Sequence, residues 1–187
     1  MQLKLVCCQE TRVDINEDGQ AQANQSYSTL LDCFSQLPLI AVLVVEKNWL
    51  KYWSCGELPE KLPSPCLNLN TPGVTIDFDS EKEISTVLCL LRSWPKLRKL
   101  YLIARQSSGQ GNADAGYGFL ERHHSPCPLL QLRTATIYGI SGTRLELGLI
   151  RFVLGNSPWL KKMFTVGSAP PTYQLLRDLL RIERASP

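Results

Sequence analysis

Residues 87–102 read VLCLLRSWPKLRKLYL, an apolar helical run followed by a proline and a short leucine-rich strand. The same phrase occupies residues 30–45, as LLDCFSQLPLIAVLVV, and residues 150–165, as IRFVLGNSPWLKKMFT. A pattern that returns in this way predicts stacked units that bury their apolar faces against one another. Stacked repeats commonly present surfaces to other macromolecules, so the pattern favours an interaction module over an enzyme core.

The three copies agree when they are aligned on Pro38, Pro95 and Pro158. Apolar residues stand four, five and eight positions before each proline, which places them on one face of a helix. Apolar residues also stand two and five positions after it, in the rhythm of a leucine-rich strand. Because proline cannot continue a helix and disfavours helical geometry in the residue before it, each helix must end there.

The spacing of the prolines indicates further units between the three copies. They are 57 and 63 residues apart, about twice the 20–29 residues of a leucine-rich unit. We therefore expect a less regular unit in each gap, with strands near residues 74–78 and 130–138, and a further strand at 3–8. The predicted fold is α/β: a leucine-rich-repeat solenoid with a curved parallel sheet on its concave side and helices on its convex side.

Two stretches without apolar periodicity are predicted loops. Residues 9–26 are polar and contain an acidic cluster, and residues 105–126 include a glycine- and serine-rich run. We expect a leucine-rich-repeat region over residues 1–126 and a C-terminal repeat segment over residues 127–187, which ends in a helix starting at Pro170-Pro171.

Length and composition limit the number of domains and the cellular location that we expect. A length of 187 residues with 44% hydrophobic residues suits one domain. No apolar run reaches the ~18 residues that span a bilayer, and the apolar N-terminus is too short for a signal peptide. The seven cysteines form no C-x-x-C pair, so buried free thiols are expected rather than disulfides or zinc ligands. These features predict a cytoplasmic or nuclear protein.

The net charge of +3 conceals an asymmetry between the two halves. Residues 1–93 hold 7 Lys/Arg and 12 Asp/Glu, whereas residues 94–187 hold 13 and 5. A polarised surface can steer a charged partner. The basic residues are scattered rather than arranged in a dense stripe, which disfavours nucleic-acid binding.

No motif indicates catalysis, a metal or a cofactor. His123-His124 and Cys127 offer too few ligands for zinc, so we expect them in a loop. Ser141 is expected to cap a helix that contains Glu146 and Ile150. The chain lacks a phosphate loop, a G-x-S-x-G elbow and an HExxH pair. We therefore predict no catalytic, cofactor-binding or metal-binding residue.

The four tryptophans fall into two pairs with different expected positions. Trp94 and Trp159 flank prolines, so we expect both to pack in the core where a helix turns into a strand. For Trp49 and Trp53, four residues apart, both a core position and a partner-binding position remain open.

A second candidate surface follows from strand geometry. If the repeat leucines point inward, the alternate residues of each strand point to the concave side. The predicted partner-binding residues there are Val44, Lys99, Tyr101, Thr136, Tyr138, Lys162 and Phe164. Exposed aromatic residues beside lysines suit a binding strip, and an uncovered face without a partner is the alternative.

Three segments carry a more specific pattern. The first joins FSQLP at 34–38, LKY at 50–52 and PEKLP at 59–63, and the second is EISTVLCLLRSWP at 83–95. The third is a tail with CP at 127–128, ISGTR at 140–144, SP at 157–158 and LLRIERASP at 179–187. Together they resemble the C-terminal half of plant F-box/leucine-rich-repeat proteins that end in an FBD domain.

The resemblance implies a protein-protein interaction module similar to the substrate-recognition half of an SCF-type ubiquitin-ligase receptor, with an FBD-like segment over residues 127–187. In such receptors an F-box docks the Skp1 adaptor and the repeats choose the substrate. No F-box is recognisable here, so Skp1 binding is not expected and the partner is an unknown protein. A stand-alone repeat scaffold or a truncated fragment without a ligase role is one alternative. A nucleic-acid binder that uses the basic C-terminal half is another.

Overall fold

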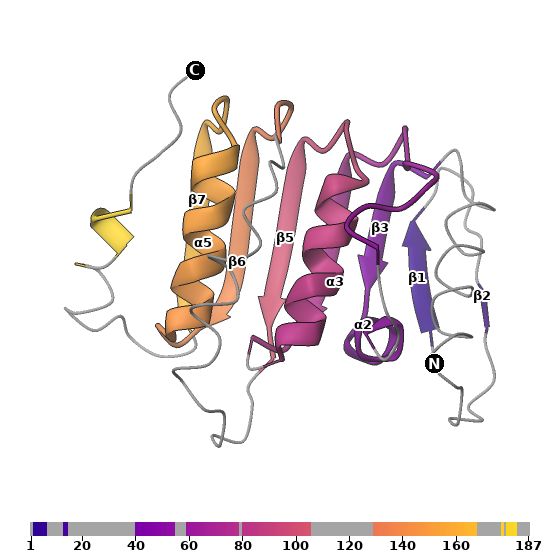
Figure 1. Cartoon of the computed structure of the whole chain (residues 1–187), viewed down its shortest axis with the longest axis horizontal. Helices are drawn as coiled ribbons and strands as arrows, with labels where there is room; N and C mark the ends of the chain where they lie inside the picture. The colour runs from indigo at the N-terminus through magenta and orange to yellow at the C-terminus, as the bar shows by residue number, and fades with distance from the viewer. Residues whose placement is uncertain are drawn as a thin grey trace.

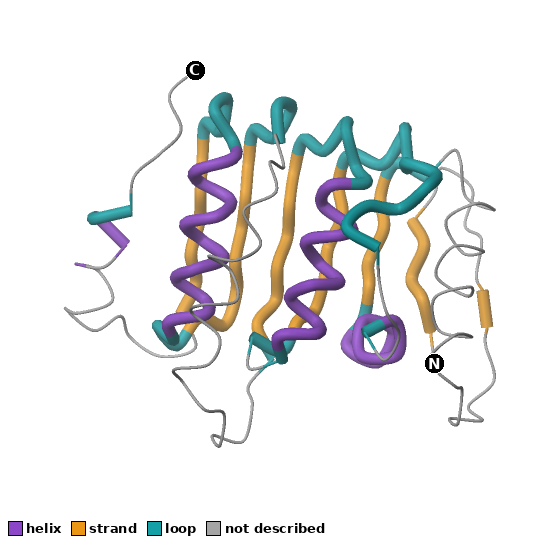
Figure 2. Tube along the Cα trace, viewed as in Figure 1, coloured by secondary structure: helices purple, strands orange, loops and turns teal. Residues whose placement is uncertain are grey.

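The computed structural model describes residues 2–6, 13–14, 40–54, 59–78, 80–105, 129–167, 177 and 179–182 (Figure 2). Within these residues the chain forms one seven-stranded sheet in the order β2-β1-β3-β4-β5-β6-β7 (Figure 1). The strands are β1 Gln2–Val6, β2 Val13–Asp14, β3 Val42–Val45, β4 Thr71–Ile76, β5 Lys99–Ala104, β6 Thr134–Ile140 and β7 Lys162–Gly167.

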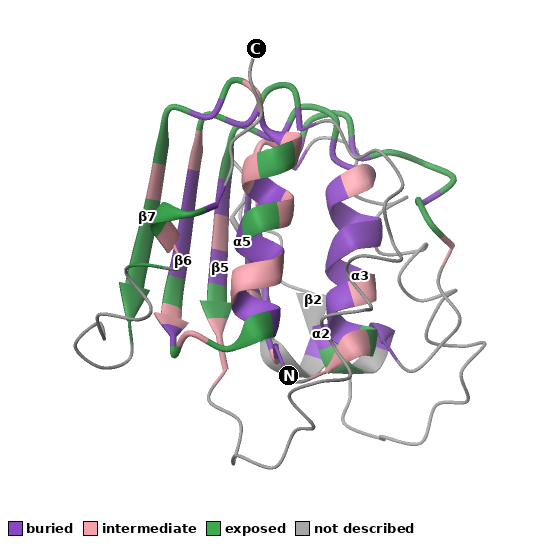
Figure 3. Cartoon of the chain, turned by 60° about the vertical axis from the view of Figure 1, so that its left-hand side comes forward, coloured by how far each residue is buried: buried purple, intermediate pink, exposed green. Residues whose placement is uncertain are grey.

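The five strands from β3 to β7 are parallel and lie side by side in chain order. β1 pairs antiparallel with both β2 and β3. The helices α2 (Lys47–Trp53), α3 (Glu81–Arg92) and α5 (Arg144–Asn156) follow β3, β4 and β6 and lie on one face of the sheet (Figures 1 and 3). The predicted α/β class, with a parallel sheet and helices along one side, is confirmed at this level.

The two longer helices begin at short polar residues followed by glutamate. The Ser80 hydroxyl accepts the backbone N–H of Glu83 at 3.3 Å at the start of α3. At the start of α5, Thr143 accepts the N–H of Glu146 at 3.3 Å, and the Glu146 carboxylate accepts the N–H of Thr143 at 2.8 Å. This reciprocal pair is a capping box, which satisfies donors left free in the first helical turn. The expected cap at Ser141 is therefore wrong by two residues.

The residues before and at the start of each parallel strand follow the same pattern of inward-facing positions. A buried aliphatic residue precedes each one: Ile40, Leu69, Leu97, Leu132 and Leu160. Three positions later comes the first core-facing residue of the strand: Leu43, Pro72, Leu100, Ala135 and Met163. The leucine-rich rhythm thus continues through β4 and β6, where proline and alanine conceal it in the sequence.

The same junctions share a backbone hydrogen-bond pattern. The carbonyl of Ala41 accepts the consecutive N–H groups of Asn70 and Thr71, both at 3.0 Å. In the same way the Asn70 carbonyl accepts from residues 98 and 99, that of Arg98 from 133 and 134, and that of Arg133 from 161 and 162. Each unit therefore starts in a fixed register against the unit before it.

The tryptophans do not all follow the expectations. Trp94 is buried where α3 turns toward β5, as predicted. Trp159 was expected in the core, but 52% of it is exposed. Trp49 and Trp53 are both buried in α2, with ring centroids 5.7 Å apart, which settles their open assignment in favour of the core.

Some strands and loops have other boundaries than the sequence predicts. The strand expected near residues 74–78 begins earlier, at Thr71, and includes Pro72, a residue that is rare in central strands because it lacks an N–H donor. The predicted loop at 9–26 contains the short strand β2. Three expected features lie outside the described residues: the helical run before Pro38, the glycine- and serine-rich run within 105–126, and the start of the C-terminal helix. No described helix is long and apolar enough to cross a membrane.

Two glycines of the sheet allow a matched test. Gly139 in β6 has φ of +77°, and a Cβ there would lie 3.0 Å from the Ala104 carbonyl oxygen. A Cβ at Gly73 in β4 would make ordinary contacts, the nearest at 3.8 Å. We expect Gly139→Ala to lower the free energy of unfolding by about 1–3 kcal/mol. Gly73→Ala should leave it unchanged or raise it by up to about 1 kcal/mol. Urea denaturation measures both, and equal losses would contradict this reading of Gly139.

Candidate functional site

The sheet face away from the helices, which we call the open face, carries the predicted binding residues. Because neighbouring strands are in register, their side chains form rows across it. The first row is Lys99, Thr134 and Lys162; the second is Val44, Gly73, Tyr101, Thr136 and Phe164; the third is Thr75, Ile103, Tyr138 and Val166. All seven predicted residues lie in these rows, so the structure brings them together. Their role in binding stays a prediction.

Among the strands whose burial is described, β3 to β7, the large exposed apolar side chains of the open face belong to β5, β6 and β7. The exposed fractions are 39% for Ile103, 41% for Tyr138, 51% for Phe164 and 45% for Val166. Large apolar side chains gathered on one face mark interaction surfaces more often than single exposed residues do. Among the predicted residues, Val44 and Tyr101 are half-buried and Thr136 is buried. These three therefore offer a partner less contact area than the exposed residues do.

An arginine and a tryptophan that the sequence analysis did not select lie beside the first row. The Arg133 guanidinium stands over the Trp159 ring, 5.6 Å from its centroid, and Nη1 donates to the Trp159 carbonyl at 3.3 Å. Cation–π contact orients an arginine while it remains exposed. The signal was present in the sequence, because Trp94 precedes its proline whereas Trp159 follows Pro158, in the position of the exposed Lys96.

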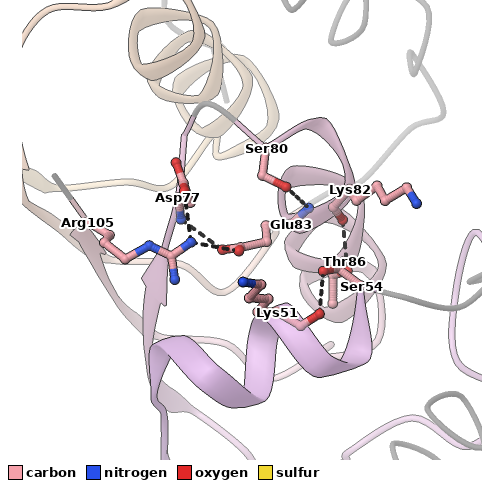
Figure 4. A network of polar contacts seen from close by, with 8 residues as sticks. All are labelled: Lys51, Ser54, Asp77, Ser80, Lys82, Glu83, Thr86 and Arg105. Carbon is pink, nitrogen blue, oxygen red and sulfur yellow. Dashed lines mark hydrogen bonds and ion pairs between the residues drawn. The ribbon is translucent and has the colours of Figure 1, made fainter. Parts of the chain in front are cut away.

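A buried glutamate holds the carboxyl ends of β4 and β5 (Figure 4). Glu83 is 2% exposed, and its carboxylate accepts the backbone N–H of Asp77 at 2.9 Å. Arg105, directly after β5, donates to the carboxylates of Glu83 and Asp77, both at 2.8 Å. These two carboxylates raise the pKa of Arg105, although its partial burial opposes the shift. The contacts connect the first turn of α3 to two neighbouring strands.

Glu146 repeats the arrangement one helix further along. It is 4% exposed, and its carboxylate accepts the backbone N–H groups of Ser141 at 3.0 Å and Gly142 at 2.6 Å. These residues follow β6 as Asp77 follows β4. In both units, a glutamate in the first helical turn thus fixes the end of the preceding strand. We call these two sets of contacts the braces at Glu83 and Glu146.

The two described cysteines are unsuited to nucleophilic chemistry. Cys66 and Cys89 are buried free thiols. Burial raises the pKa of Cys66 to about 11, offset in part by the Trp94 side chain. Burial likewise raises the pKa of Cys89 to about 11, against the opposing effects of Arg92 and Ser93. Since the thiolate is the reactive form, both behave as small apolar side chains.

The described residues also contain no group of three or more His, Cys, Asp or Glu side chains able to hold a metal ion. His123, His124 and Cys127 lie outside these residues, so their expected loop role stays a prediction.

An open hollow of about 370 Å³ lies at the far edge of the sheet, between α5, β7 and residues 179–180. Its lining includes Ile150, Leu154, Met163 and Leu179 and is mostly apolar. On the helix side of β7, Met163 and Thr165 therefore remain at least partly accessible, whereas Leu102 in β5 and Ile137 in β6 are buried.

Comparisons with known proteins agree with the pattern seen in the sequence. Residues 121–164 match the FBD family, a span that includes β6, α5 and the start of β7. The chain is also 30% identical over 178 residues to an F-box/FBD/LRR-repeat protein of Arabidopsis thaliana. The chain is thus similar to a plant F-box/FBD/LRR-repeat protein. The resemblance found in three sequence segments is therefore confirmed.

The similarity to this F-box/FBD/LRR-repeat protein covers 92% of the present chain but only 42% of the relative, so the chain spans about two fifths of its length. No solved structure matches the chain. The expected division between residues 126 and 127 stays a prediction. The sheet continues across it, because β5 pairs with β6.

The brace at Glu83 gives a stability prediction. We expect Arg105→Met to lower the free energy of unfolding by about 2–3 kcal/mol, because it leaves the buried Glu83 carboxylate without its cation. The control is Lys82→Met, one residue before Glu83 and exposed, which should change it by less than about 0.5 kcal/mol. Urea denaturation of both variants provides the comparison. Similar losses would show that Arg105 does not support Glu83.

The thiols give a pH prediction. Below about pH 9 both are protonated in the folded and unfolded chain. Between pH 9 and about 11 the unfolded chain releases these protons while the folded chain keeps them, so the free energy of unfolding falls as pH rises. The slope is at most about 1.4 kcal/mol per pH unit for each thiol.

Cys66→Ala/Cys89→Ala should remove this part of the pH dependence. Urea denaturation at several pH values from about 8 to 10.5 measures the difference. Parallel curves for the two proteins would contradict the raised pKa values.

Proposed function

We propose that this chain is a leucine-rich-repeat solenoid that acts as a protein-binding module, similar to the substrate-recognition half of an SCF-type ubiquitin-ligase receptor and without catalysis of its own. The observation that carries the proposal is the open face of β5, β6 and β7, where aromatic and aliphatic side chains stand exposed on regularly stacked parallel strands.

The regular junctions between strands support the solenoid. The carbonyls that receive paired N–H groups belong to residues 41, 70, 98 and 133, and the next pair begins at residue 161. The intervals are thus 29, 28, 35 and 28 residues, and three of them match the 20–29-residue length of a leucine-rich unit. The longer interval contains the glycine- and serine-rich run, which suits an insertion between two strands.

The chemistry of the open face supports protein binding. Tyr138 and Phe164 offer large contact areas with few side-chain torsions to immobilise, and aromatic residues are frequent at binding hot spots. The braces at Glu83 and Glu146 hold the carboxyl ends of β4, β5 and β6. A surface that is ordered before binding loses little conformational entropy when it binds a partner. The Arabidopsis relative bears the names of an F-box and of leucine-rich repeats, which favours substrate recognition within a ligase over other binding roles. Buried free thiols favour the cytoplasm or nucleus as its location.

Site-specific cross-linking tests this proposal. A photoreactive benzoylphenylalanine replaces Phe164 on the open face, or Leu67 as the control, and the full chain is irradiated in an Arabidopsis extract. The two positions are matched because 51% of Phe164 and 53% of Leu67 are exposed. We expect a defined adduct from position 164 that position 67 does not give.

The cross-linked protein, identified by mass spectrometry and purified, should bind the wild-type chain directly. Phe164→Asp should weaken this binding about tenfold or more, whereas Leu67→Asp should leave it unchanged. No adduct at position 164, the same adduct at both positions, or equal affinities for the two aspartate variants would each refute the open face as the binding site.

A further inference from the structure

Basic residues gather at one end of the open face. They lie at or just before the starts of β5, β6 and β7, all are exposed, and we call them the basic end: Lys96, Arg98, Lys99, Arg133 and Lys162. The backbone carbonyls of Arg98 and Arg133 receive the paired N–H groups of the next unit. These stacked junctions place the basic residues of three successive units next to one another.

Carboxylates lie at the opposite end of the sheet, where the parallel strands end. Glu46 follows β3, Asp77 and Glu83 follow β4, and Glu146 follows β6. Glu83 and Glu146 are buried in their hydrogen-bond networks, and Asp77 is paired with Arg105. Within the described ranges, no ion pair joins a residue of the basic end to a carboxylate. The positive charge of this end is therefore not neutralised by the acidic groups along the sheet.

The basic end adjoins the exposed apolar rows. Along β7, Lys162 in the first row is followed by Phe164 in the second and Val166 in the third, and along β5, Lys99 is followed by Tyr101 and Ile103. At ~3.3 Å per residue the distance from the first row to the third is ~13 Å. A matching ligand needs negative groups at one end and apolar groups within that distance.

Protein chemistry fits this layout better than nucleic acid. Strands are ~4.8 Å apart, so β5 to β7 spans only ~10 Å, too short a track for a phosphate backbone with many contacts. The accessible third row contains Ile103, Tyr138 and Val166, and the two aliphatic side chains provide no aromatic platform on which bases could stack. Carboxylates beside apolar side chains occur together in acidic protein segments.

We propose that the open face of β5 to β7 binds an acidic protein segment, whose carboxylates contact the basic end and whose neighbouring apolar side chains pack on Tyr138, Phe164 and Ile103. The inference rests on the proposed protein-binding function and specifies its partner chemistry. Arg133, held over Trp159, is the preorganised contact for a carboxylate at the edge of this surface.

Selection from a phage-displayed library of random peptides of about 12 residues, a length that crosses the face even when partly folded, tests the inference. The bait is the immobilised full chain. We expect the enriched peptides to combine Asp or Glu with apolar residues. Their affinity should fall about tenfold in Lys99→Glu/Lys162→Glu and also when salt is raised from low concentration to ~0.15 M.

The matched control is Lys82→Glu, an exposed lysine at the other end of the strands, which should retain the affinity. Thermal unfolding verifies that each variant is folded. Enrichment of peptides without acidic residues, no enrichment, or equal losses in both variants would overturn the inference. So would tighter binding of an oligothymidylate of similar length with the same dependence on Lys99 and Lys162, because the basic end would then serve nucleic acid.

These outcomes separate the inference from the proposed function. A partner that cross-links at position 164 but is insensitive to Lys99→Glu/Lys162→Glu would leave the protein-binding role intact and remove only the acidic character of the partner.

Discussion

Each parallel strand from β4 to β7 begins by donating two consecutive backbone N–H groups to one carbonyl of the unit before it. This junction fixes the register of every strand, because the first inward-facing residue follows it at a constant distance. A strand displaced by one residue would turn its buried row outward and its exposed row inward. The core and the open face therefore depend on the same backbone contact, and neither can change without the other.

The two buried glutamates accept backbone N–H groups at the opposite, carboxyl end of the strands. A chain that leaves a strand for a helix exposes N–H groups at the turn and in the first helical turn. Glu83 and Glu146 accept the donors at the turn, and Arg105 compensates the charge of Glu83. The Ser80 and Thr143 hydroxyls each accept one donor of the first helical turn. Acidic groups are thereby drawn to the carboxyl ends of the strands, while the basic residues at their starts remain exposed. The charge separation across the sheet follows from this structural use of glutamate.

The proposed binding site is a surface rather than a pocket. The open face draws single residues from three strands that are separated by about 28 to 35 positions in the chain. The helices pack on its other side, and Glu83 and Glu146 bind residues at the carboxyl ends of its strands. The similarity to a protein named for leucine-rich repeats is compatible with such a surface, since stacked repeats commonly present extended binding surfaces.

The sequence by itself determined the α/β class, the inward leucine rows and the seven residues of the open face, because the period-two alternation of a strand decides which residues share a side. It did not show that Pro72 stands in a central strand, since proline argues against one unless neighbouring units force the register. It misplaced Trp159, which follows its proline, as the exposed Lys96 does, and stands exposed beside Arg133. The Arg105–Glu83 pair and the basic end were decided only by tertiary structure, because residues distant in the chain meet there through the stacking of whole units.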